Sequence, residues 1–333
     1  MRRVTIADVA DHANVSKSTV SQFINKRYDY MGAETKKRIE ASIKELGFQV
    51  NIVARSLKMK QTSTIGVIVA NILHTFSTQI IRAIEDVCHE NNFHIIVCNA
   101  DDDPEKEKNY INMLRAKQVD GLIIFPTGGN YDLYAEMERQ KYPLVFIDRI
   151  VEGVTVDTLL LDNKHAMELA VNHLIERGHE RIGIITTSLI RNVTPRVERI
   201  SGFVNAMNKK GLDVNKEWVK GLELRDIQKG LLKMLSMEKS PTALIAGNDL
   251  TMIELLRCTV KHNIRIPDDI ALVGVDELAF ADIFTPSLST ISQPAFDMGK
   301  KATKLLLNKI TENGVVQPNL YRFKGELIAR SST

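Results

Sequence analysis

The sequence predicts a small all-α helix-turn-helix head followed by an α/β body of two lobes, each with a doubly wound parallel sheet. Three observations lead to this fold class. The first 61 residues carry twelve Lys and Arg against six Asp and Glu, a net charge of +6, whereas the rest of the 333-residue chain carries −3. Short helical stretches with capping residues fill this head. From residue 65 onward, short apolar runs alternate with amphipathic stretches, which is typical of parallel sheets covered by helices.

The composition is that of an ordinary globular protein, with 44% hydrophobic and 26% charged residues. No apolar run approaches the roughly 20 residues that span a bilayer, and the first residues form no apolar leader. The three cysteines, Cys88, Cys98 and Cys258, are too far apart for a disulfide framework or a metal clip. We therefore expect a cytoplasmic protein with no membrane segment, no metal and no cofactor.

The head begins with two short predicted helices. Thr5 can cap the first, and Asp8, three residues later, completes a start resembling a capping box. Ser16 can cap the second helix, which covers residues 17–24. Asn14 marks the turn between them, so the pair has the pattern of a helix-turn-helix.

A third predicted helix, Glu34–Leu46, ends at Gly47 and braces this pair. Residues 51–60 also look helical, but an isolated helix of that length is marginal in water. A polar linker follows, and the body begins after it.

The body shows two successive series of strand-like runs. Ligands of doubly wound folds bind at the carboxyl ends of the strands, which draws attention to the polar residues that follow them. The expected strands are Ile65–Ala70, His94–Asn99, Gly121–Phe125, Leu144–Asp148 and Thr158–Leu161 in the first series, then Arg181–Thr186, Ala243–Ala246 and Ile270–Asp276.

Several of these segments resemble the lactose-repressor family of bacterial transcription regulators. The likeness is carried by Val4–Ala10, Val15–Ser21, Asn25 and Ala54–Leu57 in the head and hinge, and by His173–His179, Asn248-Asp249, Gly274–Asp276 and Pro286–Ile291 in the body. It covers essentially the whole chain.

The resemblance implies two periplasmic-binding-protein-like lobes around a ligand cleft, with three chain crossings. It also implies domain limits of 1–49 for the DNA-binding head, 50–61 for the hinge, and 62–333 for the effector-binding and dimerisation body. Within the body, the first lobe is expected at about 62–160 and 291–319, and the second at about 161–290 and 320–333.

The second helix of such a head lies in the major groove of double-stranded DNA and presents its early residues to base edges. Here those residues are Lys17 and Ser18, with Gln22 reaching a base edge or a phosphate. The family often has arginine at the position of Gln22, so this chain lacks a positive charge there and is expected to recognise a different DNA sequence from those relatives. The other expected DNA contacts are Thr5, Ser16, Thr19, Ser21 and Asn25. The alternative is a solvated surface helix with no such role.

The resemblance also implies that two hinge helices meet in the minor groove of a palindromic operator, where apolar side chains wedge between base pairs. Ala54 and Leu57 occupy the wedge positions, and Val50 stands where the family commonly has proline, which loosens the hinge entry. The accompanying polar contacts are expected from Asn51, Arg55 and Lys58. A passive linker is the alternative.

The cleft of the body is expected to bind a small-molecule effector. Family positions carry over onto Phe76, Asp148, Arg199, Asn248, Asp276 and Gln293, a set that suits a polyhydroxylated ligand.

Three further arginines refine this hypothesis. Arg191 and Arg196 lie close to Arg199 in the sequence, and Arg149 follows a strand of the first lobe. Several guanidinium groups in one cleft favour a carboxylate or phosphate ligand. Residues 221–225 offer no aromatic ring where many relatives have one, which disfavours a purine. We therefore expect an acidic sugar derivative, as in regulators of 2-keto-3-deoxygluconate or hexuronate catabolism; the alternative is that these arginines pair with surface carboxylates.

The expected function is regulation of transcription, as a repressor of sugar-acid catabolic genes, by a homodimer. The chain shows no leucine heptads after Ala329, unlike the lactose repressor's tetramer-forming tail. Residues 72–91 are a candidate partner face, because Ile80, Ile84 and Val87 recur at helical spacing, although an internal core would give the same pattern.

Two other classes of function share the fold. A transport-type solute-binding protein would need a signal peptide and no basic head. An enzyme would need a nucleophile with its base, and no such pairing is visible in the sequence. Both are disfavoured.

Overall fold

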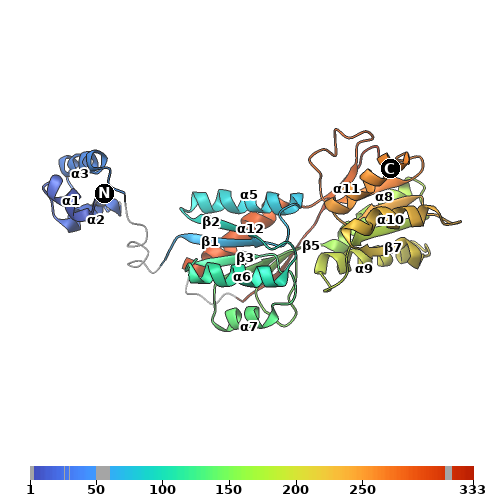
Figure 1. The fold of residues 1–333 in the computed structure, drawn as a ribbon, viewed down its shortest axis with the longest axis horizontal. Helices are drawn as coiled ribbons and strands as arrows, with labels where there is room; N and C mark the ends of the chain where they lie inside the picture. The colour runs from blue at the N-terminus through green and yellow to red at the C-terminus, as the bar shows by residue number, and fades with distance from the viewer. Residues whose placement is uncertain (1–3, 26, 30, 50–60, 312–316) are drawn as a thin grey trace. The chain divides into compact units, whose positions relative to one another are not determined.

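The computed structural model describes residues 4–25, 27–29, 31–49, 61–311 and 317–333. The chain divides into two compact units, one ending at Thr62 and one beginning at Ser63. Figure 1 shows the helices and strands of both.

The head is a three-helix unit made of α1 (Ile6–His12), α2 (Lys17–Ile24) and α3 (Ala33–Leu46). The predicted caps are confirmed. Thr5 and Asp8 form a reciprocal capping box, the Ser16 side chain accepts from the Thr19 amide, and Gly47 ends α3 in the left-handed conformation. Its small core consists of Val9, Ala10, Ala13, Val20 and Ile39.

The first lobe contains a six-stranded sheet in the order β11-β5-β4-β3-β1-β2, and all of its pairings are parallel. Helices α5 and α12 cover one face, and α6 and α7 cover the other. The elements are β1 (Thr64–Val69), α5 (Thr75–Glu90), β2 (His94–Asn99), α6 (Pro104–Ala116), β3 (Gly121–Ile124), α7 (Tyr131–Arg139), β4 (Leu144–Ile147), β5 (Asp157–Leu161), α12 (Ala295–Thr311) and β11 (Leu320–Phe323).

The second lobe repeats this plan with a sheet in the order β12-β10-β9-β8-β6-β7, in which only the β10–β12 pairing is antiparallel. Helices α8 and α9 cover one face, and α10 and α11 the other. The elements are α8 (Asn163–Glu176), β6 (Ile182–Thr187), α9 (Thr194–Lys209), β7 (Val219–Leu222), α10 (Ile227–Leu235), β8 (Ala243–Ala246), α11 (Asp249–His262), β9 (Ala271–Val275), β10 (Ser289–Ser292) and β12 (Glu326–Ile328), with 3-10 turns at Lys216–Trp218 and Leu224–Asp226.

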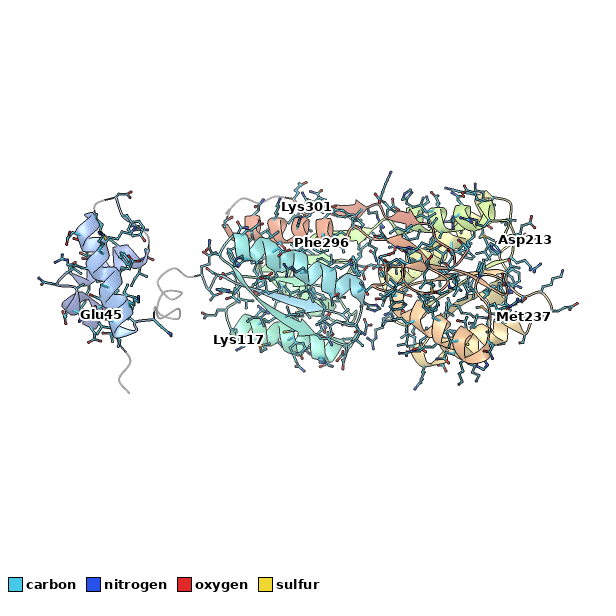
Figure 2. The ribbon with its side chains drawn as sticks, turned by 90° about the horizontal axis from the view of Figure 1, so that it is seen from above. Glu45, Lys117, Asp213, Met237, Phe296 and Lys301 are labelled. Carbon is cyan, nitrogen blue, oxygen red and sulfur yellow. The ribbon has the colours of Figure 1, made fainter. Side chains whose placement is uncertain are left out.

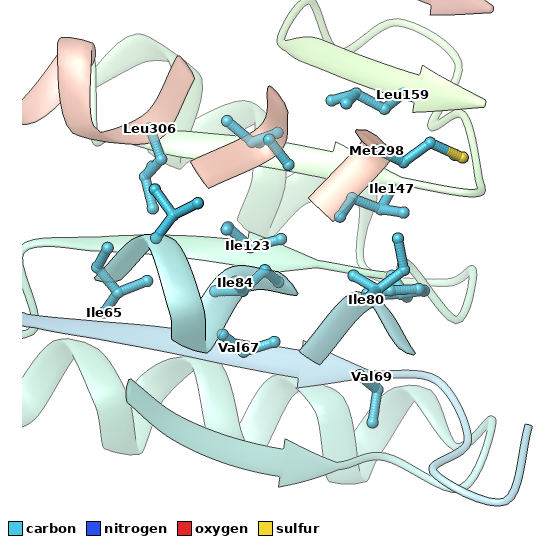
Figure 3. Close-up of a cluster of buried hydrophobic side chains, with 14 of the residues drawn as sticks. Ile65, Val67, Val69, Ile80, Ile84, Ile123, Ile147, Leu159, Met298 and Leu306 are labelled. Carbon is cyan, nitrogen blue, oxygen red and sulfur yellow. The ribbon is translucent and has the colours of Figure 1, made fainter. Parts of the chain in front are cut away.

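The apolar stripe that suggested a partner face on α5 belongs to the internal core, which is the alternative that the sequence left open. Ile80, Ile84 and Val87 are buried inside the first lobe, where α5 packs against both the sheet and the neighbouring helix α12 (Figure 3). Gly299 permits this approach, because a Cβ there would lie 2.7 Å from that of Ala83. On the outer side of α12, Phe296 and Lys301 stay exposed (Figure 2).

The chain crosses between the lobes three times, and each crossing is one or two residues long. Asp162 joins β5 to α8, Gln293-Pro294 joins β10 to α12, and Lys324-Gly325 joins β11 to β12. The expected lobe limits need correction at the last two crossings. The unit that returns to the first lobe is α12 followed by β11, because Leu320–Phe323 pairs in parallel with Thr158–Leu161.

Candidate functional site

The candidate DNA-reading surface of the head is the amino-terminal part of α2. Lys17, Ser18 and Gln22 are exposed there. Their spacing places Lys17 and Ser18 one turn before Gln22, and the first turn of the helix carries no acidic residue. These three side chains can therefore face an anionic partner together.

The other predicted head residues mostly support the helices. The Thr5 hydroxyl is held by the Asp8 carboxylate at 2.7 Å, and the Ser16 hydroxyl lies 2.6 Å from that of Ser18 and 2.8 Å from that of Thr19. Asn25 donates to the Ser21 carbonyl oxygen at 2.7 Å. These contacts fix the turn and the start and end of α2. The predicted hinge contacts Asn51, Ala54, Arg55, Leu57 and Lys58 lie outside the residues that the structure describes.

In the body, the structure brings eight of the nine predicted effector residues into one pocket between the lobes. These residues are Phe76, Asp148, Arg149, Arg196, Arg199, Asn248, Asp276 and Gln293, joined by His74, Asn71 and Phe125. The ninth, Arg191, lines an adjoining outer chamber that shares Asn71, His74 and Arg196 with the pocket. The open space measures about 40 Å³ in the inner pocket and about 330 Å³ in the outer chamber. The inner pocket as it stands has room only for a few water molecules.

Two aspartates hold corresponding positions on the two sides of this pocket. Asp148 follows β4 in the first lobe and Asp276 follows β9 in the second, with φ angles of 69° and 80°. Left-handed backbone is uncommon for residues other than glycine and clusters at functional sites. This conformation turns the chain at the strand end, where ligands of such folds bind.

The second-lobe wall of the pocket is a hydrogen-bonded polar surface. The buried guanidinium of Arg199 donates to Asn163 Oδ1 at 2.9 Å and to the Gly247 carbonyl oxygen at 2.5 Å. Gln293 Nε2 donates to Asp276 Oδ1 at 2.5 Å. Burial and the neighbouring Asp249 carboxylate raise the pKa of Asp276. These groups are fixed before any ligand arrives.

One of the contacts across the cleft was missed by sequence reasoning. His74 Nδ1 of the first lobe lies 2.5 Å from Asp249 Oδ1 of the second, and the Thr75 amide donates to Asp249 Oδ2 at 2.7 Å. Burial alone would lower the pKa of His74, but the hydrogen bond and charge of Asp249 raise it above the ordinary value of 6.5. The position of Asp249 after a strand was visible in the sequence, whereas its partner was not.

The three additional arginines converge on Asp102, a residue that the sequence analysis did not select. Arg149 Nη1 lies 2.8 Å from Asp102 Oδ1, and Arg196 Nη2 donates to Asp102 Oδ2 at 3.2 Å. Arg191 donates to the main-chain oxygen of the same residue. The alternative that these arginines pair with carboxylates therefore holds for Arg149 and Arg196, but the pairing lies between the lobes rather than on the outer surface.

Within the described residues, no group of three His, Cys, Asp or Glu side chains could hold a metal ion. Among the described helices, none is long and apolar enough to cross a membrane.

Two family models match the chain. The model for bacterial regulatory proteins of the lacI family matches residues 5–51, and the model for periplasmic binding proteins and the sugar-binding domain of the LacI family matches residues 62–321. The second match covers most of the body.

Curated relatives match over nearly the whole length. The "Probable HTH-type transcriptional regulator EndR" of Paenibacillus polymyxa is 46% identical over 92% of this chain and 91% of its own. The HTH-type transcriptional repressor PurR of Aliivibrio salmonicida is 33% identical, with 98% of both chains covered. The HTH-type transcriptional regulator KdgR of Bacillus subtilis is 34% identical over 98% of this chain and 97% of its own.

The fold of this chain also resembles that of proteins with solved structures. The crystal structure of the lac repressor dimer bound to operator and the anti-inducer ONPF aligns with a TM-score of 0.86 at 23% identity, covering 99% of each chain. At this identity the likeness establishes the fold.

Proposed function

The chain belongs to the lacI family of bacterial regulatory proteins, and from this premise we propose that it represses carbohydrate-catabolic genes under the control of an acidic sugar derivative. Its relatives are DNA-binding transcriptional regulators and not enzymes. The proposal concerns the genes and the effector. It also includes action in the cytoplasm, where the operator DNA is found.

The observation that carries the effector class is the combination of cations and hydroxyl-binding groups in one cleft. Arg149 and Arg196 line the inner pocket together with Asn248, Asp276 and Gln293, and Arg191 and Arg196 line the outer chamber. Guanidinium groups recognise a carboxylate by a fork of parallel donors, and carboxylate and amide groups bind sugar hydroxyls by accepting and donating hydrogen bonds. A polyhydroxylated acid uses both kinds of group.

A neutral sugar is the second candidate. The carboxylates of Asp102, Asp148 and Asp276 offset part of the arginine charge. A transcriptional regulator whose solved structure is named as a CelR–cellobiose complex has the same fold, at 24% identity and a TM-score of 0.73, with 99% of this chain and 100% of that chain covered. Its ligand carries no acidic group.

The proposed mechanism couples ligand to lobe position. A ligand acts only through its different affinities for two states of the protein. We propose that effector binding changes how far the lobes close and, in a homodimer, how two heads engage a palindromic operator. DNA and effector must then affect each other's binding to the same degree.

The test combines calorimetry with gel-shift titration of the full chain. D-galacturonate and 2-keto-3-deoxygluconate are compared with D-galactose and cellobiose. We expect micromolar binding of an acid and at least a tenfold change in affinity for a palindromic site upstream of its own gene. Tight binding of a neutral sugar alone would contradict the acidic effector, and the absence of any specific DNA shift would contradict the regulatory role at that site.

A further inference from the structure

Asp102 contacts all three of the additional arginines of the cleft. It lies in the loop after β2, with a φ angle of 55°, and its amide donates to the Ala70 carbonyl oxygen at 2.6 Å. This anchored backbone directs the carboxylate between Arg149 of the first lobe and Arg196 of the second. Asp102 lines the outer chamber, while both arginines also line the inner pocket. Its carboxylate therefore links the outer chamber to two arginines of the inner pocket.

Arg149 and Arg196 carry one more positive charge than Asp102 neutralises, and the next anion is Asp148, whose Oδ2 lies 3.7 Å from Arg149 Nε. Burial alone would raise the pKa of Asp102, but Arg149 and Arg196 outweigh it and keep the pKa below the ordinary value. Burial lowers the pKa of Arg196, and the positive charge of Arg149 adds to that effect, although Asp102 opposes it. A ligand carboxylate near Arg149 and Arg196 would therefore meet two cations whose charge Asp102 and Asp148 already offset in part, and it would compete with Asp102 for them.

Arg149 also has an unused donor. It is only 6% exposed, and its Nε forms no hydrogen bond within the described chain, lying 3.7 Å from Asp148 Oδ2. Its contact with Asp102 Oδ1 is an ion pair rather than an aligned hydrogen bond. Buried donors without partners are costly, so a ligand oxygen at this place gains both a hydrogen bond and a charge interaction.

We propose that Asp102 determines effector specificity by competing with an effector carboxylate for Arg149 and Arg196. The proposal rests on the acidic effector class proposed above. A carboxylate entering the inner pocket has to share or displace an anion that the protein itself supplies. A neutral sugar does not compete with Asp102, whose carboxylate keeps its ion pairs with Arg149 and Arg196. Asp102 thereby weakens the binding of acidic ligands and not that of neutral ones. Only acids whose hydroxyl groups make enough contacts in the inner pocket bind well.

The experiment is calorimetric titration of the full chain with D-galacturonate, 2-keto-3-deoxygluconate and D-galactose. The variants are Asp102→Asn, Asp102→Glu and Asp101→Asn. Asp101 is the matched control, because it lines the same outer chamber but pairs with Lys106 and touches none of the three arginines. Asp102→Ser is a second neutral variant in case Asp102→Asn does not fold.

We expect at least fivefold tighter binding of an acid by Asp102→Asn, and wild-type binding by Asp101→Asn. Asp102→Glu, which retains the charge, should stay close to the wild type. A purely structural role would weaken acid and neutral ligand together. Equal or weaker acid binding by the neutral variant therefore overturns the competition by Asp102 while leaving the acidic effector class intact. If no acid binds to the wild type or to Asp102→Asn, the acidic effector class fails, and this inference fails with it.

Discussion

The two walls of the cleft satisfy their polar groups in different ways. On the second lobe, Arg199 and Asp276 bond to neighbours of their own wall, including Asn163 and Gln293. On the first lobe, His74 and the Thr75 amide find their partner, Asp249, on the opposite wall. Arg199 and Asp276 are thus held by groups of their own wall, whereas His74 and Thr75 of the first lobe gain their partner only when the lobes close. Ligand entry therefore disturbs the contacts across the cleft far more than those within the second lobe.

The largest effect is expected from the preorganised wall. Arg199→Ala leaves two buried acceptors without a donor and the Asp276 carboxylate without its nearby cation. Loss of one partner from a buried charged network costs about 3–5 kcal/mol. Urea denaturation of the body measures this cost. Arg257→Ala, which removes an exposed arginine paired with Glu254, is the control and should change stability by less than about 0.5 kcal/mol. Similar values for both would show that the wall is not preorganised by Arg199.

A smaller effect on unfolding is expected for the contacts across the cleft. Asp249→Ala removes the acceptor of His74 and of the Thr75 amide, at a cost of about 1–3 kcal/mol. Both donors reach water once the lobes separate, so the variant should be more open rather than less folded. Small-angle scattering should give a larger radius of gyration for it in the absence of effector. An unchanged radius together with a loss of stability as large as for Arg199→Ala would contradict the difference between the walls.

The same contact should depend on pH in a defined direction. Because Asp249 raises the pKa of His74 above 6.5, the protonated imidazole stabilises the folded body fully below pH 6.5. That contribution is lost as the pH rises through the raised pKa. The melting temperature of the wild type should therefore exceed that of His74→Asn most clearly at pH 5.5 to 6, and the gap should narrow at higher pH. Asp102 and Asp276 also face this histidine, so the double variant His74→Asn/Asp249→Asn is the reference. If the difference in melting temperature between the wild type and His74→Asn increased with pH, protonated His74 would not be the stabilising partner of Asp249.

The smallest effect on the body is expected from the head. Lys17→Ala removes an exposed cation from the start of α2. The slope of log affinity against log salt for DNA should fall in magnitude by about 1.8 for a homodimer, which is about 0.9 for one phosphate contact in each subunit. Effector binding and lobe closure should remain unchanged. Gel shifts at several salt concentrations measure the slope, and Lys44→Ala on α3 is the control; an equal change in both would mean a general charge effect.

The elements that sequence analysis predicted are those with continuous apolar runs. Gly121–Ile124 and Leu144–Ile147 are buried on both faces, so their character is visible locally. Of the four strands that it missed, β10 lies inside its sheet, and β7, β11 and β12 lie at sheet edges, where Leu320–Phe323 alternates between exposed and half-buried positions. Edge strands carry a weak pattern because one side has no neighbour.

The residues of the candidate site also fall into those that the sequence could predict and those that it could not. Asp148, Asn248 and Asp276 follow recognisable strands, and the rule that ligands bind at carboxyl ends was enough to select them. Asp102 also follows a strand, within the run Asp101–Asp103, but its role depends on arginines 47 and 94 residues away in the chain. Pairings across the cleft have no local signature, so only the folded body revealed them.

The brevity of the three crossings has a mechanical consequence. Connections of one or two residues leave almost no slack, so the lobes can turn about the crossings but cannot slide apart. A small change of backbone torsion at the crossings therefore produces a large displacement in the parts of the lobes farthest from them. Gln293 belongs both to a crossing and to the pocket. A ligand that bonds to Gln293 therefore acts directly on a crossing, where a small movement changes the relative position of the lobes most.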